Sequence, residues 1–138
     1  MSFREKAAWI TLVVLLLCFG LYFGAIATHR ISGKGWASVH LLMQCVAAFI
    51  VLQIGLTLAA RWTTPRDGRS PRDEREQLIV SRSHTVGYYV LMVLTLVIGV
   101  PFHAGLPAVV LVNLALLDVV VAGLVVAVAQ IVMFRRGF

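Results

Sequence analysis

The residue with the clearest chemical potential is Asp118, which interrupts a long apolar run, "NLALLDVVVAGL". Placing a charged carboxylate at the centre of a membrane helix costs roughly 2.5–3.5 kcal/mol on insertion scales. Such a carboxyl is expected to hold a proton, to pair with another polar group, or to face a polar interior. Asp118 is therefore predicted either to join helices by hydrogen bonding or to bind a proton, a cation or a partner subunit.

Few other polar side chains occur within the apolar runs, and these are the candidate partners of the Asp118 carboxyl: Gln44, Gln53, Thr57, Asn113 and Gln130. His40 and Gln44 share one face of a helix at a spacing of four residues. Gln53 and Thr57 share nearly the opposite face, which predicts a central position for this helix in the bundle. Hydrogen bonds of this kind average only about 0.6 kcal/mol in membranes, so they specify arrangement more than they stabilise it.

Four histidines raise the question of a metal or haem site. In a chain that crosses a membrane four times, His29, His40 and His103 are expected near one face of the bilayer and His84 near the other. The histidines have neither H-x-x-x-H spacing nor a cysteine partner, so we interpret them as polar helix ends and predict no cofactor. A three-histidine metal site and a haem remain alternatives. The sequence also contains no P-loop, G-x-S-x-G or H-E-x-x-H motif, so we do not expect an enzyme.

The elements that must position these residues are four apolar runs in a chain of 138 residues with a mean hydropathy of +0.93. A helix needs about 20 apolar residues to cross a bilayer. The runs are continuous rather than alternating, which indicates helices and not barrel strands. We therefore predict an all-α, polytopic membrane protein with a single domain, 1–138, that forms a bundle of four transmembrane helices. The expected helices are 7–28, 36–61, 71–101 and 106–134, with a cytoplasmic loop at 61–70.

Positive charge predicts the orientation of these helices. Of the 12 Lys and Arg residues, all but Arg30 and Lys34 lie at the two termini or around the middle loop. The positive-inside rule places both termini and this loop in the cytoplasm of a bacterial inner membrane. The clusters suit anionic lipid headgroups, and we expect no nucleic-acid partner.

The N-terminus also has some features of a signal peptide. Arg4 and Lys6 precede an apolar stretch that ends in "AIA" at 25–27. The stretch exceeds the roughly 7–15 residues of a typical signal core, so an uncleaved first helix is expected.

A dense run of charge, "SPRDEREQLI", precedes the third apolar run. Ser70 suits an N-cap and Pro71 the first helical position. The acidic residues lie near the positive end of the predicted helix, and Arg72 can reach Glu76 one turn later. The run is either a solvated helix start or a docking surface for a partner. The candidate docking residues are Arg72, Asp73, Glu74, Arg75 and Glu76.

Small residues at a spacing of four predict close helix packing. Gly20 and Gly24 form a G-x-x-x-G pattern, and Gly123 and Ala127 form a similar pair in the fourth apolar run. We expect both faces to be buried against protein, either within the chain or in an oligomer.

The Asp73, Glu74, Arg75 run, followed by Ile79 and then by Tyr88 and Tyr89, resembles a family of uncharacterised small bacterial four-helix membrane proteins. In that family a similar acidic-basic motif precedes the third helix. The resemblance implies a four-helix membrane fold and assigns no activity or site residue.

Three functions are compatible with these features. The first is a membrane accessory or regulatory protein that contacts partner proteins through its helices and juxtamembrane charges. The second is an oligomeric transporter of a small solute, a proton or an ion that uses Asp118. The third is a metal- or haem-binding membrane subunit. The expected partners are the lipid bilayer and either a protein partner or further copies of the chain.

Overall fold

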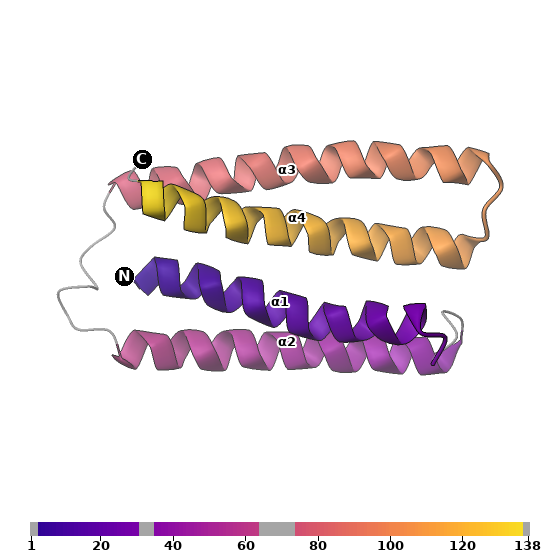
Figure 1. The fold of residues 1–138 in the computed structure, drawn as a ribbon, viewed down its shortest axis with the longest axis horizontal. Helices are drawn as coiled ribbons and strands as arrows, with labels where there is room; N and C mark the ends of the chain where they lie inside the picture. The colour runs from indigo at the N-terminus through magenta and orange to yellow at the C-terminus, as the bar shows by residue number, and fades with distance from the viewer. Residues whose placement is uncertain (1–2, 31–34, 64–73, 137–138) are drawn as a thin grey trace.

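The computed structural model describes residues 3–30, 35–63 and 74–136, which form α-helices and the short turns next to them. Four helices follow one another along the chain: α1 (Phe3–Ala27), α2 (Trp36–Thr63), α3 (Glu74–His103) and α4 (Ala108–Arg136) (Figure 1). Each of them is long and apolar enough to cross a bilayer. The predicted class, an all-α bundle of four transmembrane helices, is confirmed.

The helices extend beyond the apolar runs that predicted them. α1 begins at Phe3, one turn before the predicted start at 7, and α2 continues to Thr63. Helices of 25 to 30 residues are roughly 38–45 Å long, which exceeds a hydrocarbon core of about 30 Å. Their polar end turns therefore lie outside the hydrocarbon. The predicted helix start at 71–73 and loop positions 64–70 lie outside the described residues.

The four helices form a row in the order α2, α1, α4, α3 (Figure 1). α1 packs against both α2 and α4, and α4 also packs against α3. The prediction of a central position for α2 was wrong, because α2 lies at one edge of the row. Its two polar faces arise because one faces α1 and the other faces outward.

Small residues allow the close approach of the helices. A Cβ atom added at Gly123 of α4 would lie 3.2 Å from Leu15 Cδ1 of α1. A Cβ atom added at Gly87 of α3 would overlap Val126 Cγ2 of α4 and lie 3.4 Å from the carbonyl oxygen of Ala122. The two interfaces of α4 therefore depend on glycine at one position each.

A hydrogen-bonded turn ends α1. The His29 amide donates to the Ile26 carbonyl and the Arg30 amide to the Ala25 carbonyl, both at 3.1 Å. His29 has a φ of 54°, so it occupies the left-handed position that glycine usually takes in such a cap. The His29 backbone thus has a clear structural role at the helix end.

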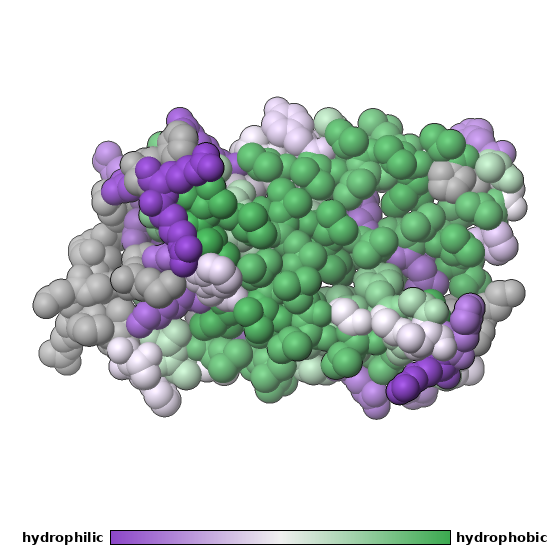
Figure 2. Space-filling view, viewed as in Figure 1, coloured by the Kyte–Doolittle hydropathy of each residue, from purple (hydrophilic) through white to green (hydrophobic). Residues whose placement is uncertain are grey.

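Charged residues gather at the end of the row that holds both chain termini (Figure 1). Arg4 of α1 pairs with Glu76 of α3 at 3.0 Å, and Glu5 of α1 pairs with Arg135 of α4 at 3.6 Å. The Arg135 guanidinium also lies 5.5 Å from the centre of the Trp9 ring. Figure 2 shows a broad apolar band between two hydrophilic ends, as a multi-pass membrane protein requires.

Candidate functional site

The Asp118 carboxyl lies between α4 and α3, and the residue is only 6% exposed. Its Oδ2 atom is 2.7 Å from the Thr95 hydroxyl of α3. Its Oδ1 atom is buried and has no hydrogen-bond partner among the described residues. The partner of Asp118 is thus Thr95, which is absent from the partners that the sequence suggested.

The Thr95 hydroxyl has a single proton and two neighbouring acceptors. Its oxygen lies 2.8 Å from the Leu91 carbonyl as well as 2.7 Å from Asp118 Oδ2. A threonine within a helix commonly donates to the carbonyl four residues earlier. The Leu91 carbonyl oxygen and Asp118 Oδ2 therefore compete for the one Thr95 proton. Asp118 Oδ1 is buried without a partner among the described residues, and an unpaired buried polar atom is costly in an apolar medium.

The surroundings of the carboxyl are apolar. Asp118 borders a cavity of about 230 Å³, and its other lining residues all have aliphatic side chains: Leu94, Val97, Ile98, Leu114, Leu117 and Val121. A buried water needs two to four polar partners, and among the described lining residues only Asp118 has a polar side chain. The arrangement can hold a proton on the carboxyl, but it offers no cationic partner for a carboxylate within the lining.

Hydrogen-bonded pairs of polar side chains join the neighbouring helices of the row. Gln53 of α2 donates to the Thr11 hydroxyl of α1 at 2.7 Å. Tyr22 of α1 donates to Asn113 Oδ1 of α4 at 3.1 Å. With Thr95 and Asp118, such a pair is present in the α1–α2, the α1–α4 and the α3–α4 interface.

These pairs match polar groups at equal depth, which sets the register of neighbouring helices. Gln53 and Asn113, which the sequence predicts to be intramembrane polar residues, lie within the apolar spans of α2 and α4. Both bond to α1 rather than to Asp118. Gln53 Oε1 and Thr57 Oγ1 are buried without a partner among the residues described.

The outward face of α2 carries polar groups that its neighbour does not cover. His40 and Gln44 are exposed there, one turn apart. Val51, Leu58 and Trp62 continue the same face and are also exposed. Gln44 is eight residues after the start of α2, or roughly 12 Å along its axis. A helix of this length overhangs a centred hydrocarbon core by about 6 Å at each end, so Gln44 lies inside the hydrocarbon.

The two pairs of small residues differ in their surroundings. Gly123 faces Leu15, and Ala127 is buried, as the packing prediction requires. Gly20 and Gly24 are exposed, and a Cβ atom added at either one would meet nothing within 4 Å. The expectation that these two glycines pack within the chain is wrong, because α2 and α4 both contact the other side of α1. Their contact with another subunit stays a prediction.

The histidines do not converge on one point. His40 lies beside Trp36, with 6.5 Å between ring centres, and His103 Nδ1 lies 2.8 Å from the Gly99 carbonyl oxygen. His29 ends α1. Across the described ranges, no group of three His, Cys, Asp or Glu side chains is placed to hold a metal ion. The structure therefore gives no support to a metal site of His29, His40 and His103.

The candidate docking residues at the start of α3 are only partly described. Arg72 and Asp73 lie outside the described residues. Glu74 and Arg75 are exposed. Glu76 bonds to Arg4 and so ties α3 to α1, a contact that the sequence did not suggest.

Comparison of the chain with protein-family models, curated proteins and solved structures gives no match. Function is therefore inferred from the residues and their geometry.

Proposed function

We propose that this protein is an accessory or regulatory membrane protein that acts by lateral association of its helices with another protein or with further copies of itself. The observation that carries the proposal is the outward face of α2, where Gln44 lies exposed within the expected hydrocarbon region. α2 contacts α1 with one side only, so this face is available to a neighbour in the bilayer.

A glutamine at this position favours association because its amide both donates and accepts hydrogen bonds. Such a bond between membrane helices is worth about 0.6 kcal/mol on average and at most about 1.7 kcal/mol. Ala47, Ala48 and Gly55 are also exposed on this side of α2. Small residues let a second backbone approach closely enough for the amide to reach its partner.

The proposal includes a membrane and an orientation. We place the protein in a bacterial inner membrane with both termini in the cytoplasm, because positive charge is concentrated at that end. Glu74 and Arg75 are exposed at this end and add a charged contact to the apolar faces of the helices.

The test is native mass spectrometry of the protein extracted gently from its own membrane, with Gln44→Leu and Gln53→Leu as matched variants. Both changes replace one glutamine of α2 by leucine, but Gln44 faces outward and Gln53 bonds to Thr11 within the chain. We expect wild type and Gln53→Leu to retain a second subunit and Gln44→Leu to lose most of it. A wild-type protein that is monomeric, or equal retention by all three, would contradict the proposal.

A second candidate function is proton binding linked to transport at Asp118. Its specific support is the carboxyl itself, which is buried, bonded to Thr95 and unpaired at Oδ1. Asp118→Asn should then abolish proton-coupled flux in liposomes while the helical content is unchanged. Absence of flux in the wild type, or equal flux in the variant, would remove this candidate.

A further inference from the structure

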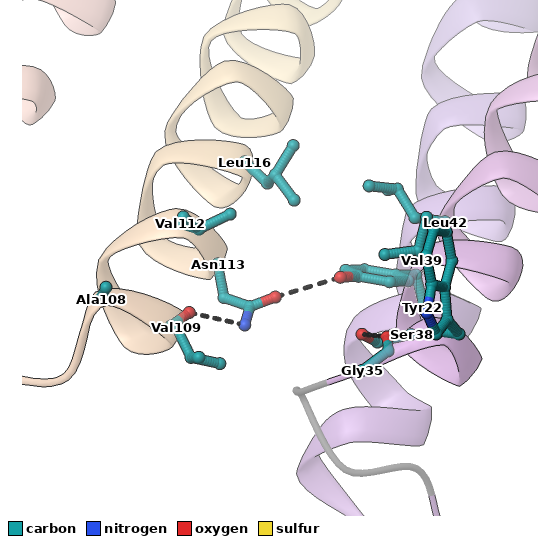
Figure 3. A pocket seen from close by; sticks show the side chains of 11 residues that line it. Tyr22, Gly35, Ser38, Val39, Leu42, Ala108, Val109, Val112, Asn113 and Leu116 are labelled. Atoms are coloured by element: carbon teal, nitrogen blue, oxygen red, sulfur yellow. Dashed lines mark hydrogen bonds between the residues drawn. The ribbon is translucent and has the colours of Figure 1, made fainter.

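A cleft opens between α2 and α4 at the end of the row where both helices begin (Figure 3). These helices both pack on α1 and do not share an extensive contact with each other. The space between them has a volume of about 560 Å³. Its walls come from 35–42, from 108–116 and from Tyr22 of α1, and we call it the α2–α4 cleft.

The cleft runs from the membrane surface into the hydrocarbon. Trp36, at the first position of α2, lies on its wall, and indole rings favour the membrane interface. From Ala108 to Leu116 the α4 wall extends roughly 12 Å along the helix axis. An occupant must therefore place a polar group near the surface and an apolar chain deeper in the bilayer.

The polar groups of the cleft are neutral. Tyr22 and Asn113 point toward one another, and the phenol donates to Asn113 Oδ1 (Figure 3). The Asn113 amide uses one of its two protons on the Val109 carbonyl, so a second proton is available to an acceptor. Ser38 donates to the Gly35 carbonyl and keeps its oxygen lone pairs. The site can thus receive a carbonyl or a hydroxyl.

The remainder of the described lining is apolar and uncharged: Gly35, Trp36, Val39, Leu42, Ala108, Val112 and Leu116 complete the wall with Val109. A phosphate headgroup would therefore lack a cationic partner among the described residues that line the cleft. A cationic head is disfavoured as well, because the positive ends of the α2 and α4 dipoles lie at this end. The volume falls within the range of roughly 300–1,000 Å³ that small-molecule sites occupy.

We propose that the α2–α4 cleft binds a single-chain amphiphile, with the apolar chain between α2 and α4 and a neutral carbonyl or hydroxyl head at Asn113, Tyr22 and Ser38. A fatty acid in its neutral form or a long-chain alcohol has this chemistry. The site is separate from the outward face of α2 and from Asp118, so it stands independently of the proposed function.

The experiment uses the full chain in phosphatidylcholine vesicles with a fatty acid that carries a photoreactive diazirine on its chain. Irradiation is followed by mass spectrometric mapping of the labelled residues. We expect label to concentrate on 35–42 and 108–116 and to decrease on addition of unlabelled fatty acid.

Two tryptophan variants of α4 provide the matched control. Val112 and Val119 have nearly equal exposure, 61% and 62%, but only Val112 lines the cleft. Val112→Trp should reduce labelling at the cleft at least fivefold, because the indole fills the space that the chain would occupy. Val119→Trp should label like the wild type.

Several outcomes would overturn the proposal. One is label spread evenly over lipid-facing segments, and another is cleft label that unlabelled fatty acid does not displace. A third is equal labelling of the cleft by a phosphatidylcholine with the same diazirine chain at the same mole fraction, which would mean that ordinary bilayer lipid fills it. If Val112→Trp fails to insert, displacement by unlabelled fatty acid on the wild type decides the question alone.

Discussion

Gly87 is the position at which a single methyl group should disrupt the interface that holds Asp118. A Cβ atom there would overlap Val126 Cγ2 and lie 3.4 Å from the Ala122 carbonyl oxygen. Valine has one strongly preferred side-chain rotamer in a helix, so Val126 cannot move aside freely. Gly87→Ala must therefore displace α3 from α4, and with it the contact between Thr95 and Asp118.

The magnitude follows from two opposing terms. Overpacking a close interface costs about 1–3 kcal/mol. Replacing glycine by alanine within a helix returns about 0.5–1 kcal/mol. Gly99 lies on the same helix, and a Cβ atom there would meet nothing within 4 Å. Gly99→Ala therefore shows only the gain in stability from replacing glycine by alanine in a helix. We expect the two variants to differ in free energy of unfolding by about 1–3 kcal/mol, with Gly87→Ala the less stable.

The assay is reversible unfolding in mixed micelles as the denaturing detergent is increased, followed by circular dichroism. Val126→Ala removes the overlapping methyl group, so the double variant with Gly87→Ala should recover most of the loss. The reasoning is refuted if Gly87→Ala is as stable as Gly99→Ala, or if Val126→Ala gives no recovery in the presence of Gly87→Ala. Either result would mean that α3 and α4 do not approach each other at Gly87.

Two further predictions concern the polar pair and the open glycines. In a double-mutant cycle measured by the same unfolding assay, Thr95→Val and Asp118→Leu should show a coupling energy of about 0.6 kcal/mol, and at most about 1.7 kcal/mol, because each variant removes one partner of the same hydrogen bond. Additive effects would mean that the bond does not contribute. Gly20→Ala should leave the monomer at least as stable as the wild type, since the added Cβ atom meets nothing within 4 Å. A loss of subunits from the native complex in this variant would identify the Gly20 face of α1 as an oligomer contact. A less stable monomer would contradict the packing described for α1.

The number and class of the elements could be predicted because they depend on local properties. Each apolar run is long enough to cross a bilayer, and helices satisfy their backbone groups without reference to their neighbours. The helix ends were less accurate, because polar turns such as Phe3–Lys6 continue α1 beyond the apolar run. The intramembrane polar residues could also be identified, since any carboxyl or amide in an apolar run is conspicuous.

The partners of these residues could not be predicted. Thr95 is a weakly polar residue in an apolar run. The sequence feature that could have identified it is its distance from the α3–α4 turn: Thr95 precedes this turn by about as many residues as Asp118 follows it. Glu76 meets Arg4 of α1, a contact that the sequence did not suggest, while its expected partner Arg72 lies outside the described residues. Both contacts depend on which helices are neighbours.

The sequence by itself therefore determined four membrane helices, their antiparallel order along the chain and the polar residues within them. Only the tertiary structure decided the row of α2, α1, α4 and α3, the exposure of Gly20 and Gly24, and the close approach at Gly87. The physical reason is that lipid tails are as apolar as leucine. In a soluble helix the apolar face marks the side that is buried, whereas in a membrane helix the faces toward lipid and toward protein are equally apolar. Shape and a few hydrogen bonds then select the neighbours, and both are properties of the assembled bundle.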